Sequence, residues 1–318
     1  MVDRVYLGID TSNYTTSVAL LGSDGSLIAN IKRPLPVKQG ERGLRQADAL
    51  FAHIKNLPPA MQEAKEYLAG RSPAAIGVSE KPRNAEGSYM PCFLAGISAA
   101  ESASAVTGAK IYRFSHQCGH IMAALYGSGR FDLLGKSFAA FHVSGGTTEL
   151  IRVHSSSAEG FRTELLGGTK DVNAGQIIDR VGVLMGLSFP AGPAMEELAL
   201  RNTKKPPVRR IRETDLSVNL SGVENLAAKL YAETGDRSLV ADFTLRTIAG
   251  ALISLSEGYE NRYGKSEFVY AGGVISNSII KSMLAGRFAA SFAPPALSAD
   301  NAVGVACLAR YADEGGAG

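Results

Sequence analysis

Residues 5–31, VYLGIDTSNYTTSVALLGSDGSLIANI, decide the fold, because they contain three short apolar runs separated by two polar turns. Apolar and β-branched runs bounded by turn residues are typical of strands. We therefore expect strands at Val5–Ile9, Thr15–Leu21 and Leu27–Ile31, with a tight polar turn after the first strand.

A similar unit returns at residues 138–165, which begin with FAAFHVSGGTTELIRV. Strands are expected at Phe138–Val143, Thr147–Val153 and Phe161–Leu165, and Ser144-Gly145-Gly146 forms the turn after the first of them. The order strand, polar turn, strand, strand is thus present twice. We interpret it as an internal duplication; two unrelated β-meanders in one chain are the alternative.

Segments with helix-like apolar spacing lie between and after these two units. They are 44–54, 59–69, 93–107, 116–126, 174–187, 193–201, 239–262 and 301–311. Asp300 is a natural N-cap for the last helix. This mixture indicates an α/β fold with two lobes and a cleft, which we divide into residues 1–134 and 135–318, with the last helix packing back on the N-terminal lobe.

The composition describes a compact chain of 318 residues, because 45% of them are hydrophobic and only 20% are charged. It excludes a disordered chain and a coiled coil. No apolar run approaches the roughly 18 residues that a membrane span needs, and the N-terminus lacks a signal-peptide core. The three cysteines are far apart and odd in number, which argues against a disulfide framework. We therefore expect a cytoplasmic protein without a membrane anchor.

His116 and His120 stand four residues apart, so a helix places both imidazoles on one face. That spacing suits two nitrogen ligands on one divalent metal, and Asp300 is the best candidate for a third ligand. The alternative is two histidines that are satisfied in the core or face solvent. Gln117 stands where a zinc protease of the HExxH type carries its general base, which argues against a protease.

Three glycine-bearing turns follow strand-like runs: Ser144-Gly145-Gly146, Gly167-Gly168-Thr169 and Gly272-Gly273. Backbone N–H groups in such turns can bind phosphate, and the N-terminus of a following helix adds to the attraction. Ordinary turn chemistry is the alternative for each of them. Neither a Walker A motif nor GxGxxG is present, so we expect no P-loop or Rossmann site.

A basic segment with two prolines covers residues 201–212. Its cations are Arg201, Lys204, Lys205, Arg209, Arg210 and Arg212. The net charge of the whole chain is only +3, so a nucleic-acid function has to rest on this local cluster. The segment is either a solvated loop or a patch that contacts phosphates.

Eight short stretches follow one another from residue 7 to residue 302. They are Leu7–Ser12, Ser115–His120, Val143–Ile151, Ala174–Arg180, Gly186–Pro193, Leu220–Gly222, Ala271–Asn277 and Ala299–Ala302. In this order they resemble the TsaD family of tRNA N6-threonylcarbamoyladenosine transferases, formerly labelled O-sialoglycoprotein endopeptidases. Eight collinear matches are far more specific than any one of them.

The resemblance implies the actin/sugar-kinase/Hsp70-like fold, which is built on a duplicated β-meander. It implies one divalent metal, iron or zinc, on His116, His120 and Asp300. It also implies ATP, ADP or an acyl-adenylate as a ligand. The family's nucleotide positions fall on the phosphate-binding residues Ser144, Gly145, Gly146 and Thr147, on Asp179 and Gly192 at the ribose, and on Asn277 at the adenosine.

The implied reaction moves a threonylcarbamoyl group from an acyl-adenylate to N6 of adenosine 37 in tRNA. The cations that would hold the tRNA are Arg201, Lys204, Lys205, Arg209 and Arg210. A smaller paralogous subunit is the implied protein partner.

The chain departs from the family pattern at four places. Asn13-Tyr14-Thr15 replaces an acidic pair, residues 82–88 replace a Gly-Pro-Gly segment, Thr147 replaces a histidine and Glu224 replaces a lysine. The metal and nucleotide residues are kept, so the chain resembles a divergent paralog. Three functions stay open: transfer to tRNA, carbamoyl transfer to a different acceptor, and a non-catalytic nucleotide-binding partner of a true transferase.

Overall fold

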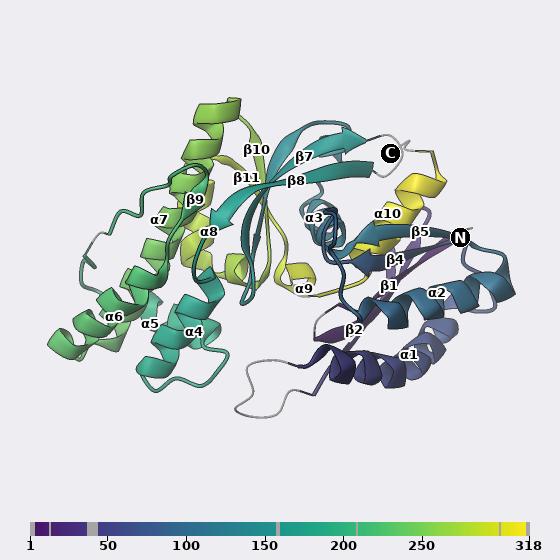
Figure 1. Ribbon diagram of the computed structural model, residues 1–318, viewed down its shortest axis with the longest axis horizontal. Helices are drawn as coiled ribbons and strands as arrows, with labels where there is room; N and C mark the ends of the chain where they lie inside the picture. The colour runs from purple at the N-terminus through teal and green to yellow at the C-terminus, as the bar shows by residue number, and fades with distance from the viewer. Residues whose placement is uncertain are drawn as a thin grey trace. The chain divides into compact units, whose positions relative to one another are not determined.

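The computed structural model describes residues 4–12, 14–36, 44–156, 160–207, 209–298 and 300–315 (Figure 1). The chain forms two compact units. Unit 1 comprises Met1–Ser137, His154–Thr163 and Ala299–Gly318, and unit 2 comprises Phe138–Val153 and Glu164–Ser298. The chain first passes from unit 1 to unit 2 three residues after the division expected from the sequence, and its C-terminal residues belong to unit 1.

Unit 1 is built on a five-stranded sheet. Its strands are β1 (Val5–Asp10), β2 (Thr15–Gly22), β3 (Leu27–Pro34), β4 (Ala75–Lys81) and β5 (Lys110–Ser115). They lie in the order β3-β2-β1-β4-β5, in which the pairs β3–β2 and β2–β1 are antiparallel and the pairs β1–β4 and β4–β5 are parallel. The three strands expected from residues 5–31 are therefore confirmed as one meander.

One continuous helix, α1 (Gln46–Leu68), replaces the two helices expected at 44–54 and 59–69. Pro58 and Pro59 lie inside it, and proline lacks the N–H that an internal helical position donates. The helix nevertheless buries one stripe of side chains that continues past both prolines against β2 and β3. The stripe is Ala49, His53, Leu57, Ala60 and Ala64. Packing along an unbroken stripe outweighs the lost hydrogen bonds.

The remaining helices of unit 1 cover both faces of the sheet. They are α2 (Phe93–Thr107), α3 (His116–Ser128), the short η1 (Phe131–Leu133) and α10 (Val303–Asp313). Val5, Leu7 and Ile9 of β1 belong to the core shared with α1 and α2. Successive strand residues point to opposite faces, so Gly8 and Asp10 face the side of α3 and α10. A Cβ on Gly8 would lie 2.3 Å from the carbonyl oxygen of Ala302, so only glycine admits this close approach.

The start of α10 corrects one expectation. Asp300 was expected to cap this helix, but the helix begins at Val303, and the Asn301 side chain accepts a hydrogen bond from the Val303 N–H at 3.1 Å. Asp300 lies before the helix with its carboxylate directed at two histidines of α3.

Unit 2 contains the second sheet. Its strands are β6 (Phe138–Val143), β7 (Thr148–Ser156), β8 (Gly160–Thr169), β9 (Ser217–Val218), β10 (Glu267–Ala271) and β11 (Ala289–Phe292). They lie in the order β11-β10-β6-β7-β8-β9. The run β8-β7-β6-β10-β11 repeats the order of unit 1, with β6 antiparallel to β7 and parallel to β10. The topology confirms the duplication inferred from the sequence.

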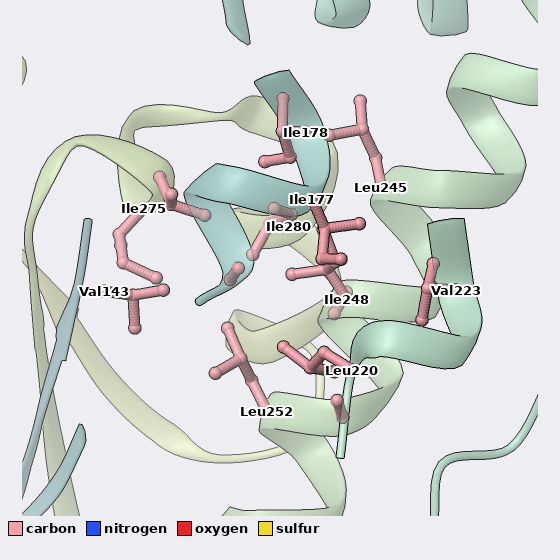
Figure 2. Packing of buried hydrophobic residues seen from close by; sticks show 14 of the residues in the cluster. Val143, Ile177, Ile178, Leu220, Val223, Leu245, Ile248, Leu252, Ile275 and Ile280 are labelled. Carbon is pink, nitrogen blue, oxygen red and sulfur yellow. The ribbon is translucent and has the colours of Figure 1, made fainter. Parts of the chain in front are cut away.

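Helices pack into the largest core of the described residues, in unit 2. They are α4 (Ala174–Leu184), α5 (Gly192–Leu200), α6 (Ser221–Thr234), α7 (Arg237–Tyr263), η2 (Gly273–Ser276) and α8 (Ser278–Ala285). The short helix α9 (Pro295–Ser298) contacts η2. Figure 2 shows side chains of α4, α6, α7 and α8 meeting in this core. The helix α6 was not among those expected.

Among the described residues, α7 is long and apolar enough to cross a membrane by length and composition. Charged residues interrupt it, which is why no uninterrupted apolar run is visible in the sequence. In the structure 78% of its apolar window is buried inside the protein. A buried core helix passes the same test, and the burial accounts for its apolar character.

Candidate metal centre and glycine-rich turn

Three potential metal ligands converge in unit 1. His116 and His120 lie on the first two turns of α3, and their Nε2 atoms are 2.9 Å apart. The Asp300 Oδ1 atom lies 3.6 Å from the Nε2 atom of His116 and 3.4 Å from that of His120. The helix starts directly after β5, and the Ser115 side chain caps it by accepting from the Cys118 N–H. The segment before α10 thus brings its carboxylate to the histidine pair.

The donor set fits a transition metal. Two imidazole nitrogens and one carboxylate, all within 4.8 Å of one another, match the ligands of three-residue zinc and iron sites. The histidines are 7% and 4% exposed, so water competes weakly for them. Within the ranges that the structure describes, this is the one group of three or more such residues. Three protein ligands leave a coordination position for substrate.

Asp10 is a residue of this site that sequence reasoning missed. Its Oδ1 atom lies 3.3 Å from the Nδ1 atom of His116, and it accepts a hydrogen bond from the Ser12 hydroxyl at 2.7 Å. A carboxylate on Nδ1 fixes the ring and directs Nε2 towards a metal. The signal that could have revealed this role is a carboxylate at the last position of β1, a strand in which every residue is buried.

Electrostatics couple the four groups. Burial by itself lowers the pKa of His116, but the Asp10 and Asp300 carboxylates outweigh it and raise that pKa to about 10. Burial, together with the charge on His116, lowers the pKa of His120. Burial opposes ionisation of Asp300, yet hydrogen bonds from the two histidines hold its pKa below the usual range. The metal-free cluster therefore keeps a proton on His116, in the place where a divalent cation would bind.

A polar row crosses the sheet next to this cluster. Asp10 on β1 is directly opposite Ser17 on β2, and Ser17 is directly opposite Lys32 on β3. Directly opposite residues of antiparallel strands share one face, so all three point towards the side of α3 and α10. Burial lowers the pKa of Lys32, and the Asp300 carboxylate partly opposes that shift. Lys32 therefore lies within electrostatic reach of Asp300, which the sequence pattern did not reveal.

The glycine-rich turn of unit 2 joins β6 to β7. It is closed by a hydrogen bond from the Ser144 N–H to the Thr147 carbonyl at 2.8 Å. The N-terminus of α4 lies against it, because a Cβ on Gly175 would be only 2.6 Å from the Ser144 carbonyl oxygen. Gly145 and Gly146 have open space where a side chain would project. An open turn beside a helix N-terminus is a suitable site for a phosphate.

The other expected nucleotide residues lie around α4, α5 and α8. Asp179 on α4 accepts a hydrogen bond from the Ala191 N–H at 2.8 Å, and burial raises the pKa of its carboxyl. Gly192 begins α5 and faces open space. Asn277 caps α8 by accepting from the Ile279 and Ile280 N–H groups. One oxygen of Asp179 and the oxygen of Asn277 therefore have structural roles.

The structure divides the expected basic cluster in two. Arg201 forms an ion pair with Glu197 one helical turn away, and the Lys204 Nζ atom lies 2.7 Å from the Asp236 carboxylate. Lys205, Arg209 and Arg210 are exposed, and within the described part of the chain they form no ion pair.

The departures from the family pattern also have structural settings. Glu224, where the family carries lysine, lies on α6 and pairs with Arg180 of α4 at 3.2 Å. Residues 82–88 form an irregular loop, and the Pro82 carbonyl accepts from the Gln117 N–H at the start of α3. Tyr14 is 45% exposed, whereas Asn13 lies outside the described residues.

Comparisons with solved structures agree with this fold. Component A of the (R)-2-hydroxyglutaryl-CoA dehydratase of Acidaminococcus fermentans matches with a TM-score of 0.57 at 16% identity, over 98% of this chain and 100% of that one. A ROK family glucokinase from Streptomyces griseus matches with a TM-score of 0.52 at 12% identity, over 96% and 99%. Full-length HypF matches with a TM-score of 0.62 at 11% identity, over 98% and 56%. The fold is therefore the actin/sugar-kinase/Hsp70-like fold.

Comparisons with known sequences identify the family. A tRNA N6-adenosine threonylcarbamoyltransferase of Streptococcus suis is 29% identical over 335 residues, covering 100% of this chain and 96% of that protein. One of Streptococcus pneumoniae is 28% identical, covering 90% and 84%. The family model TsaD, described as tRNA N6-adenosine threonylcarbamoyltransferase, matches residues 37–307. The chain thus belongs to the TsaD family of transferases, as a divergent member.

Proposed function

We propose that this protein is a metal- and nucleotide-dependent transferase that moves a threonylcarbamoyl group from an acyl-adenylate to N6 of adenosine 37 in tRNA. The observation that carries the proposal is the buried cluster of His116, His120 and Asp300, with Asp10 fixing the first of them. Family membership supplies the reaction class.

Unit 1 would hold the metal, which we propose is iron or zinc. His116 and His120 would offer their Nε2 atoms, and Asp300 would offer a carboxylate oxygen. When bound, such a metal polarises a phosphoryl or carbonyl oxygen and orients the substrate. Asp10 would keep the His116 ring oriented, and His116 would release its proton when the metal binds.

Unit 2 would hold the nucleotide portion, which is ATP, ADP or the adenylate. The turn from Ser144 to Thr147 would bind the phosphate through its backbone, beside the N-terminus of α4. The first two N–H groups of α4 already donate to the Thr148 hydroxyl and the Ser144 carbonyl. The Ala191 N–H orients Asp179, whose second oxygen would accept from a ribose hydroxyl. Gly192 leaves room for the sugar, and the Asn277 amide would donate to the adenosine.

We propose tRNA as the acceptor and the basic segment as part of its binding surface. Three of the five cations expected to hold the tRNA are exposed and form no ion pair among the described residues: Lys205, Arg209 and Arg210. Phosphate contacts of this kind hold the acceptor in register without reading its sequence. A cytoplasmic location and a smaller paralogous subunit as partner complete the proposal.

The test has a binding part and a transfer part. Protein purified without chelators would be examined by native mass spectrometry with and without ATP or ADP, with wild type beside His116→Ala and His154→Gln. We expect wild type and His154→Gln to bind one metal and one nucleotide, and His116→Ala to lose the metal. This result would support the metal site. The metal-loaded protein would then receive tRNA and radiolabelled threonylcarbamoyl-adenylate. A wild-type protein that binds neither metal nor nucleotide contradicts the proposal.

A second candidate function is a non-catalytic nucleotide-binding partner of an active transferase. It is favoured by Glu224, which pairs with Arg180 at the position where the family carries lysine, and by Thr147, which replaces a histidine. It requires nucleotide binding without transfer by the metal-loaded protein. Carbamoyl transfer to a different acceptor would leave the tRNA unlabelled and would place the label on an amine added to the assay, whereas hydrolysis of the adenylate would label neither.

A further inference from the structure

A groove of about 360 Å³ in unit 2 lies between the end of the basic segment and one face of α7. The segment supplies Arg210 and Arg212, and α7 supplies Ser254, Gly258 and Asn261. These helix positions are four and three residues apart, so they follow one face of α7. Arg212 was part of the basic cluster in the sequence but has no role in the function proposed so far.

Specific contacts fix the segment against α7. The Ser254 hydroxyl donates a hydrogen bond to the Ile211 carbonyl at 2.7 Å, and Ile211 packs against the core of unit 2. Glu213 lies so close to α7 that a Cβ on Gly258 would be 2.8 Å from its carboxyl carbon. Arg210 and Arg212 flank the anchored Ile211, are exposed, and both line the groove. The two guanidinium groups are therefore held on a fixed piece of backbone.

The two carboxylates of the groove already have partners. Glu213 accepts a hydrogen bond from the Leu216 N–H, and Glu257 forms an ion pair with Arg287 at 2.8 Å. Arg210 and Arg212 form no ion pair with any residue that the structure describes. Two guanidinium groups and the Asn261 amide line one groove, which favours an anion with several oxygen acceptors. Arginine binds phosphate oxygens in pairs, which makes phosphate the matching chemistry.

We propose that this groove binds backbone phosphates of the tRNA acceptor through Arg210 and Arg212, and that Arg201 and Lys204 contribute little. The inference rests on the proposed function, because it takes tRNA as the substrate. Its structural basis is the contrast within one segment. Arg201 and Lys204 must first leave Glu197 and Asp236 to meet a phosphate, whereas Arg210 and Arg212 have no ion-pair partner among the described residues.

The experiment compares two double variants of the full-length protein that remove the same charge from the same segment. One is R210Q/R212Q, and the other is R201Q/K204Q. Binding of an unmodified tRNA transcript would be measured by fluorescence anisotropy from about 50 to about 200 mM salt. We expect R210Q/R212Q to weaken binding about 10-fold or more and to reduce the slope of log Kd against log salt by about 1–2. We expect R201Q/K204Q to change Kd by less than about 3-fold.

R210K/R212K provides the matched rescue, because it keeps both charges and removes the paired donors. We expect it to restore the salt slope but only part of the affinity. Melting temperatures of all variants would show that they are folded; the substituted side chains are exposed.

Four results would overturn the inference. Equal losses in the two glutamine variants would show that net charge, and not the groove, determines binding. If wild type transfers the label to tRNA and R210Q/R212Q binds tRNA as tightly as wild type does, the groove is excluded as a tRNA-binding site. The proposed function then remains in place. Inorganic phosphate could raise the melting temperature of wild type but not that of R210Q/R212Q, while both proteins bind tRNA equally. That result would assign the groove to a free phosphate ligand. A wild type that binds no tRNA would overturn both the inference and the proposed function.

Discussion

The two units repeat one strand order, but the turns after their first strands differ in chemistry. In unit 1 the turn that follows β1 is rich in polar side chains that are used internally. The Thr11 hydroxyl donates to the Cys92 carbonyl and accepts from the Gly96 N–H, and the Ser12 hydroxyl donates to Asp10. In unit 2 the turn that follows β6 carries Gly145 and Gly146, which face open space.

This difference shows how a duplicated frame acquires two functions. Buried side chains in unit 1 hold the carboxylate of Asp10 against His116, which builds a site for a cation. In unit 2, Gly145 and Gly146 leave the backbone of the turn open beside the helix α4, which suits an anion. The strand order sets where the turns lie, and the turn residues set what each turn can bind.

The largest expected effect comes from removing a metal ligand. His120→Ala removes one of the three metal ligands, so metal affinity should fall by more than about 100-fold. This loss exceeds the roughly 10- to 100-fold loss that is typical when a residue that only orients a ligand is replaced. The measurement is titration of the metal-free protein with zinc or iron(II). In the absence of metal, the nucleotide affinity of the variant should stay within about 3-fold of that of wild type, because unit 2 supplies those contacts. Retained metal affinity would remove His120 from the site.

Asp10→Asn tests the support behind the metal centre with nearly the same side-chain size. The neutral amide no longer holds the His116 ring by charge, so metal affinity should fall by about 10- to 100-fold. The same titration measures it, with Asp24→Asn, in an exposed turn of the same unit, as the control. A loss as large as that of His120→Ala would indicate that Asp10 itself binds the metal.

Gly175→Ala and Gly145→Ala compare a closed and an open position around the turn of unit 2. A Cβ at residue 175 would meet backbone atoms of Ser144 and Gly145 at 2.6–2.8 Å, so unfolding free energy should fall by about 1–3 kcal/mol. A Cβ at residue 145 meets nothing within 4 Å, so stability should change by less than about 0.5 kcal/mol. Urea denaturation measures both. Equal losses would show that the turn is not packed as described.

A smaller effect than that of Gly175→Ala is expected in the pH dependence of the metal-free protein. The pKa of His116 is raised from 6.5 to about 10 on folding, so its stabilisation is fully present below pH 6.5 and is lost as the pH rises through about 10. Between pH 7 and pH 8, the unfolding free energy should fall by about 1 kcal/mol more in wild type than in His116→Gln. Parallel urea denaturation curves measure the difference. An identical pH dependence would show that His116 is neutral in the folded, metal-free protein.

Much of this site was predictable from local patterns. The spacing of His116 and His120 predicts a shared helix face, and the run from Phe138 through Ser144-Gly145-Gly146 predicts a strand and its turn, because both patterns depend on a few neighbouring residues. The contribution of Asp10 was not predictable in this way. It lies 106 residues before His116, and only the pairing of β1 with β4 and of β4 with β5 brings them together.

The sequence by itself determined the duplicated meander, the family and the residue types of both sites. The tertiary structure alone decided which residues work together. In the sequence Asp300 was a candidate both for a helix cap and for a third metal ligand, and the packing of its segment beside α3 directs its carboxylate at the histidines. Six similar cations became distinct only when Glu197 and Asp236 paired with two of them. The physical reason is that strand and helix propensities act within a few residues, whereas burial and ion pairing depend on segments far apart in the chain.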